Sequence, residues 1–132
     1  MRRLTTVMPH LYDILLVAAG GALGAVTRFL VQQCALAPHE KYVHTLGVNI
    51  TGCIAIGVVW ALLMHFNAPQ WMHRLLIAGF LGGYTTFSAF ALDSMQLLQA
   101  GRIITAMTYM TLSVAGGLAA CICAYYFTKQ LL

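Results

Sequence analysis

The sequence predicts an all-α integral membrane protein with four transmembrane helices. Hydrophobic residues make up 61% of the chain and charged residues only 8%, whereas a soluble domain has about 25% charged residues. The apolar runs are long enough to cross a bilayer core, which takes about 20 helical residues. The formal charge of +4 comes from scattered basic residues, so it does not indicate a nucleic-acid partner.

The first helix is expected over about residues 11–31, after a polar lead that contains Arg2 and Arg3. Its apolar run exceeds the core of a signal peptide, which is about 7–15 residues long. Gly20 and Gly24 are four residues apart, and small residues at this spacing let membrane helices approach closely. Glycine is also common in membrane helices in general, so close packing at this motif is a hypothesis.

The second helix is expected over about residues 42–66, between a loop at Pro38 and a turn at residues 67–70. The third helix is expected over about residues 75–98 and the fourth over about residues 103–127. No linker, low-complexity tract or repeat is visible between them. The whole chain is therefore expected to form a single transmembrane domain in contact with the lipid bilayer.

The distribution of basic residues gives little information about orientation. Four spans place both chain ends on one side, and the basic residues divide almost evenly between the two sides. They are Arg2, Arg3, Arg74 and Lys129 on that side, and Arg28, Lys41 and Arg102 on the other. Because the positive-inside rule then favours neither orientation, we expect insertion both ways and an antiparallel homodimer about a two-fold axis in the membrane plane.

The third helix is expected to be broken near residues 82–86, where two adjacent glycines precede two adjacent threonines. Glycine destabilises a helix interior, and β-branched threonine is a modest helix former. A break at membrane depth persists only where the freed backbone groups are buried in protein or face an ion or water. Freed carbonyl oxygens are hard ligands that suit a small cation.

Three stretches resemble the CrcB-type, or Fluc, family of fluoride channels. They are GGYTTFSAF at residues 82–90, GGALGAVTR at residues 20–28 and GVNITG at residues 47–52. With a weaker similarity in the fourth span, the resemblance covers essentially the whole chain. It implies a four-helix subunit that pairs antiparallel to form two pores. It also implies passive fluoride export across a bacterial-type inner membrane to relieve fluoride toxicity, without enzymatic activity.

The resemblance also implies roles for residues of the third span. The backbone carbonyls of Gly82 and Thr85 from both chains would bind a structural sodium ion at the two-fold axis. Phe87 and Phe90 would line the fluoride pore, although phenylalanines at this spacing more often pack in a core or face lipid. Ala89 stands where the family usually has threonine, which removes a hydroxyl from the expected polar track.

The other spans carry further pore candidates. Arg28 lies within the first span, where a charge costs at least ~2.5–3.5 kcal/mol, unless its side chain extends to the interface. Asn49 has two amide donors for an anion, or it makes a hydrogen bond between helices. Thr105, Tyr109 and Ser113 recur at every fourth position, so they form one row of hydroxyls that serves an anion or helix packing.

Fluoride selectivity requires that protein groups replace tightly held water. Ring edges of phenylalanine carry a positive partial charge and can favour an anion. The expected hydrogen-bond donors are Asn49, Ser88, Tyr109 and Ser113. Asp93 lies one helical turn past Phe90. It is interpreted either as a residue at the interface or as an acidic residue in a vestibule of the pore.

Competing functions meet specific difficulties. A proton-coupled four-helix exporter, the main alternative, needs a carboxylate deep in the membrane, but Asp13 and Asp93 lie toward the ends of spans. An intramembrane hydrolase needs a serine with a nearby base, and no histidine lies in the central half of a span. A scaffold that only packs helices is a further alternative.

The cysteines are interpreted as small apolar packing residues rather than metal or disulfide sites. They are Cys34, Cys53, Cys121 and Cys123.

Overall fold

The computed structural model describes residues 10–34 and 40–132, and this part of the chain is helical apart from short connections. Arg2, Arg3 and Pro38 lie outside the described residues. Four helices are long and apolar enough to cross a membrane, which confirms the predicted all-α membrane class. They are Leu11–Cys34, Lys41–His65, Gln70–Gln99 and Ile103–Leu131.

Each of the last two spans consists of several helical segments. The first two spans are α1 (Leu11–Cys34) and α2 (Lys41–His65). The third contains α3 (Gln70–Met72), the π-helix η1 (His73–Leu81), α4 (Gly82–Tyr84) and α5 (Phe87–Gln99). The fourth contains α6 (Ile103–Thr111), the π-helix η2 (Leu112–Gly116) and α7 (Gly117–Leu131). The third span begins at Gln70, earlier than expected, because Pro69 precedes it in an extended conformation that suits a helix start.

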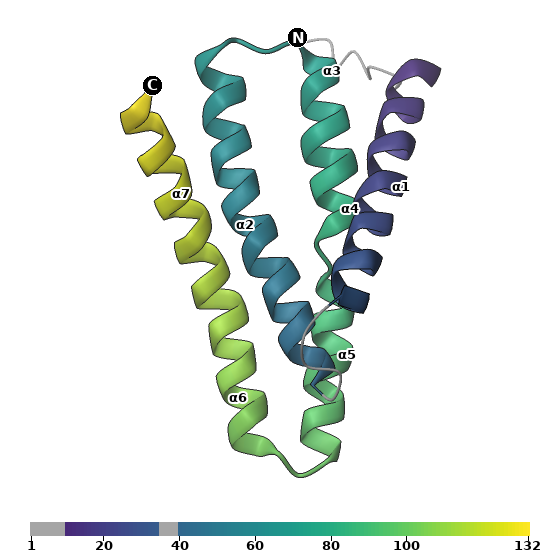
Figure 1. Ribbon diagram of the computed structural model, residues 1–132, viewed down its shortest axis with the longest axis vertical. Coiled ribbons are helices and arrows are strands. Elements are labelled where there is room, and N and C mark those ends of the chain that lie inside the picture. Colours follow the sequence, from purple (N-terminus) through teal and green to yellow (C-terminus); the bar gives the residue numbers. More distant parts are fainter. Residues whose placement is uncertain (1–9, 35–39) are drawn as a thin grey trace, which may run out of the picture.

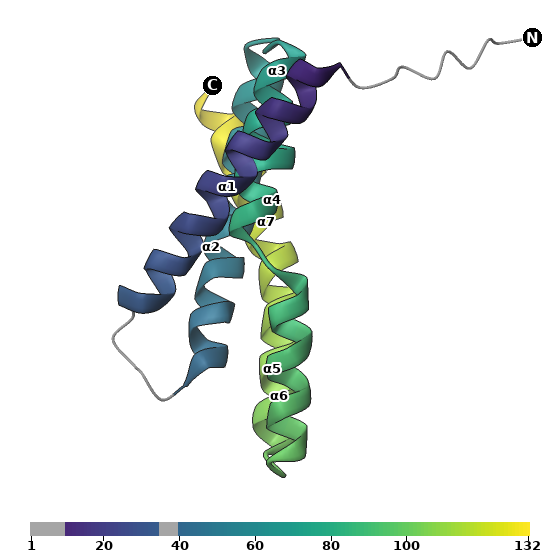
Figure 2. The same cartoon turned by 90° about the vertical axis from the view of Figure 1, so that its right-hand side faces the viewer.

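The four spans form an open bundle rather than a closed one. Figure 1 shows the start of α1 and the end of α7 at the same end of the molecule, with α2 between the third and fourth spans. The most extensive contacts join α2 to α7 and α1 to η1. Figure 2 shows α5 and α6 running together, away from the end of α1 and the start of α2.

The buried core is small and lies between α5 and α6. Leu97, Ala106 and Tyr109 form its buried cluster, and Phe90 is among the half-buried residues that pack on it. Many large apolar side chains are exposed instead, including Ile104 at 84%. Such a surface suits contact with lipid tails, which cover apolar side chains that water would not.

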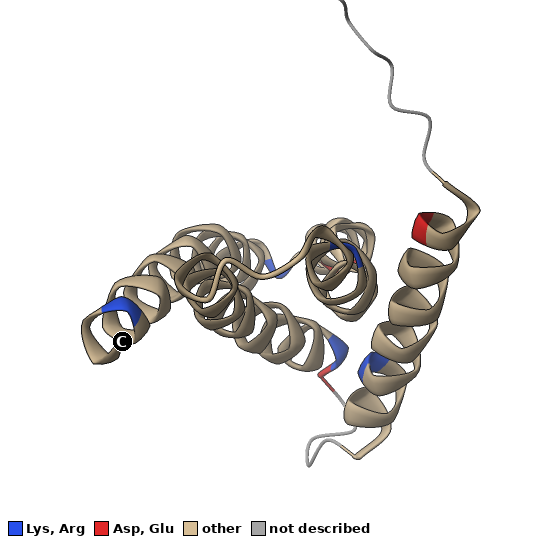
Figure 3. Ribbon diagram, turned by 90° about the horizontal axis from the view of Figure 1, so that it is seen from above, with Lys and Arg blue, Asp and Glu red and all other residues tan. Residues whose placement is uncertain are grey.

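Charged side chains are sparse along the helices, as Figure 3 shows from one end of the bundle. Arg74 Nη1 lies 2.6 Å from Asp13 Oδ1, so an ion pair links η1 to the start of α1. Arg102 Nη1 lies 3.3 Å from Glu40 Oε2. The hydrogen bonds and the charge of Glu40 raise the pKa of Arg102. Both pairs join neighbouring spans close to their ends.

Gly20 and Gly24 bring α1 against the backbone of the third span, as their spacing predicts. A Cβ atom at Gly20 would fall on the Leu75 carbonyl, and one at Gly24 would fall on the Phe80 carbonyl. The absence of a side chain at both positions therefore sets how closely α1 approaches η1. Gly47 of α2 differs, because a Cβ atom there would meet nothing within 4 Å.

Gly24→Ala is expected to destabilise the protein by about 1–3 kcal/mol, the usual cost of overpacking. Gly47→Ala is the matched control, because it adds the same methyl group to open space. Thermal unfolding in detergent measures both variants. A melting temperature that falls equally in both, or in neither, would contradict the close packing of α1 on η1.

Candidate functional site

The third span leaves the helical conformation at Thr85 and Thr86. Thr85 has φ −80° and ψ 158°, and Thr86 has φ −150° and ψ 114°, so both residues are extended. Gly82, in contrast, is helical with φ −63° and ψ −37°. Within the expected range of residues 82–86, the interruption therefore falls on the β-branched threonines, which tolerate extended backbone well, rather than on the glycines.

Gly83 serves close approach instead. A Cβ atom at Gly83 would fall on the Gly21 carbonyl of α1, whereas one at Gly82 would meet only the Ile77 carbonyl of its own span, at 3.6 Å. A side chain at Gly83 would thus separate α1 from the third span just before the extended residues. Gly83 allows this segment to pack against α1, while the threonines change the direction of the chain.

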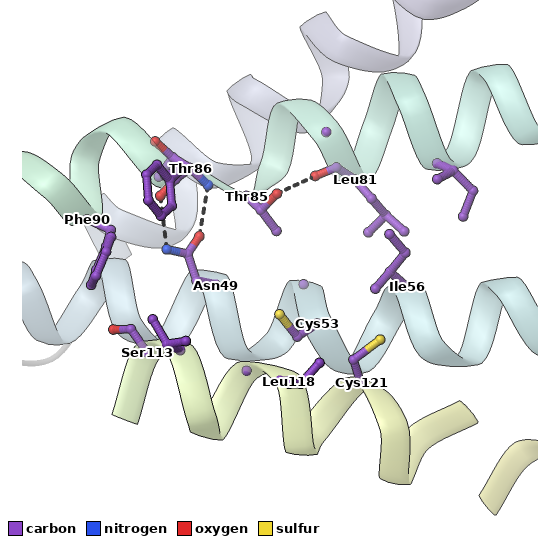
Figure 4. A pocket seen from close by; sticks show the side chains of 16 residues that line it. Asn49, Cys53, Ile56, Leu81, Thr85, Thr86, Phe90, Ser113, Leu118 and Cys121 are labelled. Atoms are coloured by element: carbon purple, nitrogen blue, oxygen red, sulfur yellow. Dashed lines mark hydrogen bonds between the residues drawn. The ribbon is translucent and has the colours of Figure 1, made fainter. Parts of the chain in front are cut away.

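Asn49 of α2 fixes the extended segment through two hydrogen bonds. The Thr86 backbone N–H donates to Asn49 Oδ1 at 2.8 Å, and Asn49 Nδ2 donates to the Thr86 carbonyl at 3.0 Å. Figure 4 shows the amide facing the Thr86 backbone with both bonds drawn. One side chain thereby replaces both helical partners of Thr86. One of the two amide protons on Nδ2 remains for another acceptor.

The same arrangement releases the carbonyls of Gly82 and Thr85 from their helical donors. In a continuous helix, the N–H groups of Thr86 and Ala89 would donate to these two carbonyls. Here the Thr86 N–H donates to Asn49, and the Ala89 N–H donates to Thr86 Oγ1 at 3.2 Å. These carbonyls can therefore accept from a side chain or bind a cation. Arg28 of α1 uses one of them, because its Nη1 donates to the Thr85 carbonyl at 3.4 Å.

A row of aromatic rings begins directly after the extended residues. The centroids of Phe87 and Phe90 are 5.3 Å apart, and those of Phe90 and Tyr109 are 5.5 Å apart. The two pairs of rings are tilted, with interplanar angles of 45° and 47°. Phe87 is 77% exposed, whereas Tyr109 is only 2% exposed. The row thus runs from the bundle surface into its core, and Phe90 lies between its ends.

A cavity of about 530 Å³ lies between the extended segment, α2 and the fourth span. Its lining includes six of the predicted site residues together with Thr86 and several apolar side chains. The six are Asn49, Gly82, Thr85, Phe87, Phe90 and Ser113. Its polar groups are therefore uncharged amide, hydroxyl and carbonyl groups, set beside aromatic rings.

Ser113 carries a buried hydroxyl that has no hydrogen-bond partner within the described residues. Leaving such a group unpaired costs about 1–3 kcal/mol, and a native unpaired group calls for a water, an ion or a ligand. Ser113 and Phe90 lie at the same end of the cavity in Figure 4. The hydroxyl is therefore a donor available to a small occupant of the cavity.

Tyr109 uses its hydroxyl differently from the predicted row of donors. The hydroxyl donates to Asp93 Oδ2 at 3.4 Å, and both residues are buried. Asp93 itself is only 8% exposed. The pair joins α5 to α6 beneath Phe90. Tyr109 therefore supports the ring of Phe90 as well as the carboxylate.

Arg28 and Ser88 lie in a separate hollow of about 460 Å³, between α1 and the start of α5. A further hollow of about 480 Å³ contains Lys41, His44 and Asp93. The two hollows share Ala89 among their lining residues. The structure thus divides the predicted pore residues into two groups, one in the cavity and one in the adjoining hollows.

Thr86 is the functional residue that sequence reasoning missed. Its backbone binds Asn49, and its Oγ1 caps α5 by accepting from the Ala89 N–H. A threonine directly before an apolar helical segment is a known capping signal. That signal was present at Thr86, next to the more conspicuous glycines.

Metal binding by charged side chains is not supported within residues 10–34 and 40–132. No group of three or more histidine, cysteine, aspartate or glutamate side chains there could hold a metal ion. The freed carbonyls of Gly82 and Thr85 are hard oxygen atoms of the kind that small cations prefer.

Comparison with known proteins identifies the same family that the sequence motifs resemble. The model of the family described as CrcB-like protein, Camphor Resistance (CrcB), matches residues 15–125. A relative from Azotobacter vinelandii, called a fluoride-specific ion channel FluC, is 44% identical over 118 residues, which is 87% of this chain and 95% of that protein. A relative of the same description from Paracoccus denitrificans is 48% identical over 113 residues, which is 84% of this chain and 90% of that protein.

Proposed function

The chain belongs to the CrcB family of ion channels, and on that basis we propose that it conducts fluoride passively out of the cell to relieve fluoride toxicity. Four apolar helices and the family membership make it a multi-pass bacterial membrane protein and a channel rather than an enzyme. We place the conduction path along the cavity beside the extended segment.

The observation that carries this proposal is the unpaired Ser113 hydroxyl in a cavity lined by phenyl rings and an amide. Fluoride is small and strongly hydrated, so a selective path must supply donors in place of water. The Ser113 hydroxyl and the free proton on Asn49 Nδ2 are such donors. The positive edges of Phe87 and Phe90 add a favourable field without a fixed charge that would hold the ion too tightly.

Two further predicted pore residues act at the approach to this path. Arg28 and Ser88 share the hollow between α1 and α5, where a guanidinium attracts anions and a hydroxyl can donate to them. Ala89 also lines this hollow, and its methyl group offers no donor there. We therefore propose that Arg28 and Ser88 attract anions toward the path and do not themselves discriminate fluoride from other anions.

Ser113→Ala tests the proposal because loss of a structural hydroxyl would lower the melting temperature, whereas loss of a conducting hydroxyl would lower fluoride flux without that fall. Fluoride release from liposomes should slow by about tenfold, which corresponds to about 1.4 kcal/mol of barrier height. The melting temperature should stay the same or rise, because a buried unpaired hydroxyl is removed. A fluoride electrode and a thermal melt provide the two readouts.

Ser113→Thr is the matched variant, since it keeps a hydroxyl at the same position. It should retain more fluoride flux than Ser113→Ala, although its extra methyl group narrows the cavity. Equal flux in the wild-type chain and Ser113→Ala would remove Ser113 from the path. A fall in both flux and melting temperature would assign it a structural role.

We also propose that the chain forms an antiparallel homodimer. Phe87 is 77% exposed although it borders the cavity, and a large exposed apolar residue at such a site is typical of a subunit interface. The nearly even distribution of basic residues permits insertion in both orientations. The partner chain would then cover Phe87 and close the open side of the cavity.

A structural sodium ion fits the backbone of the extended segment. The carbonyls of Gly82 and Thr85 have both lost their helical donors, and two chains would supply four neutral oxygens. The bond from Arg28 to the Thr85 carbonyl counts against a second cation there, but it is long and leaves one lone pair free. When bound, the ion would neutralise the dipoles of these carbonyls.

Replacing sodium with a large organic cation is expected to destabilise the dimer by about 1–3 kcal/mol. This is the stabilisation expected from a ligand that binds only the folded dimer and nearly saturates its site. The fraction of dimer against temperature, measured by size-exclusion chromatography, reports this loss. Returning sodium should restore the dimer. Identical dissociation curves in the two salts would exclude a structural sodium ion.

A further inference from the structure

Two thiols from different spans open into the cavity. Cys53 of α2 and Cys121 of α7 both line it, and Figure 4 shows the two side chains on the facing helices that border the cavity. Within a single helix neither cysteine has a partner for metal binding, but the fold brings them together. We propose that Cys53 and Cys121 form a binding site for a soft, two-coordinate metal cation, represented here by the mercuric ion.

The spacing of the two thiols follows from glycines on the facing helices. A Cβ atom at Gly117 would lie 3.2 Å from Cys53 Sγ, and one at Gly57 would fall on the Cys121 carbonyl. Each cysteine therefore lies opposite a glycine, where no side chain separates the helices. Gly117 and Cys121 are four residues apart, which places their Cβ positions about 5–6 Å apart on one face. Gly117 thus lies against Cys53 and one helical turn from Cys121.

The chemistry of this pair favours a soft cation. Thiolate sulfur selects soft metals over hard ones. The mercuric ion displaces one proton from each thiol, two S–Hg bonds form, and both protons pass to water. The doubly charged ion and two thiolates make a neutral complex, which matters because an uncompensated charge is costly in an apolar cavity.

The position of the site gives it a consequence for transport. Asn49 and Ser113 line the same cavity as the two thiols. A metal bound by Cys53 and Cys121 should therefore obstruct fluoride movement along this cavity. This consequence rests on the proposed function, whereas metal binding by the thiols does not.

The test uses the full chain with the two other cysteines replaced, C34A/C123A. Cys34 and Cys123 are exposed, lie outside the cavity lining and would bind mercury on their own. Mercuric chloride is added to the purified protein, and the remaining thiols are counted with a chromogenic reagent. One equivalent of mercury should remove both thiols, and ultraviolet absorption should report the S–Hg bonds.

Single variants distinguish a shared site from two separate thiols. Cys53→Ala and Cys121→Ala, each in the same background, should weaken mercury binding by about 100-fold or more, because the second bond is then lost. Methylmercury accepts only one thiolate and should bind each single variant about as well as the parent. Two equivalents of mercury per chain, or unchanged binding in either single variant, would overturn the shared site.

Flux measurements separate this proposal from the function on which its consequence rests. One equivalent of mercury should stop fluoride release from liposomes with the C34A/C123A protein, and a dithiol should restore it. Uptake of one mercury by both thiols with unchanged flux would overturn the obstruction. A lack of fluoride release before mercury is added would contradict the proposed function and leave the thiol count valid.

Discussion

Replacing Phe90 with isoleucine is expected to lower fluoride flux by at least about tenfold, a barrier increase of about 1.4 kcal/mol. The phenyl ring lies between Phe87 and Tyr109, with centroid distances of 5.3 and 5.5 Å. Isoleucine keeps an apolar side chain there but removes the positive ring edge that favours an anion. The same change at Phe87 should lower flux as well. Fluoride-electrode recordings from liposomes measure both variants.

Phe127→Ile is the matched control, because Phe127 of α7 is 65% exposed and lies outside the cavity lining. Its replacement should leave fluoride release unchanged. Dimer content must be measured for every variant, since Phe87 is assigned to the subunit interface as well. Wild-type flux in both Phe87→Ile and Phe90→Ile would exclude the rings from the conduction path.

Replacing Asn49 with alanine is expected to be the most destabilising of these changes, at about 2–5 kcal/mol. The variant leaves the N–H and the carbonyl of Thr86 without partners, and each unpaired buried group costs about 1–3 kcal/mol. Water cannot fully replace these bonds within a bilayer. Yield of folded protein and the urea or thermal midpoint in detergent measure the loss.

Two variants define the role of the Asn49 amide. Asn49→Asp keeps the acceptor for the Thr86 N–H but removes the donor to the Thr86 carbonyl, so we expect loss of stability together with repulsion of fluoride. Thr27→Val in α1 is the control, because Thr27 Oγ1 donates to the Leu23 carbonyl of its own helix. If Asn49→Ala were as stable as Thr27→Val, the two hydrogen bonds to Thr86 would not hold the extended segment.

The helical architecture could be predicted because it depends on properties visible along the chain. Long apolar runs and a scarcity of charge require helices in a bilayer, and all four are found. The spacing of Gly20 and Gly24 likewise predicted the close packing of α1, because small residues at every fourth position act within one helix face.

The details of the site depend on contacts between distant residues, which the sequence does not contain. Whether the Asn49 amide faces an anion or a neighbouring backbone depends on where Thr86 lies, 37 positions further on. Tyr109 appeared to be a free donor because the buried Asp93 carboxylate is remote from it in sequence. The separation of Ser88 from Ser113 also arises from the direction of the chain after Thr86.

The most direct test of the central claim is the reversal potential of a planar bilayer that contains the protein, with fluoride on one side and chloride on the other. A path lined by uncharged donors and phenyl edges predicts a reversal potential far from zero, with the sign that fluoride movement sets, and no dependence on a proton gradient. A reversal potential near zero would show that both halides pass equally. A current that required a proton gradient would identify a coupled exporter instead.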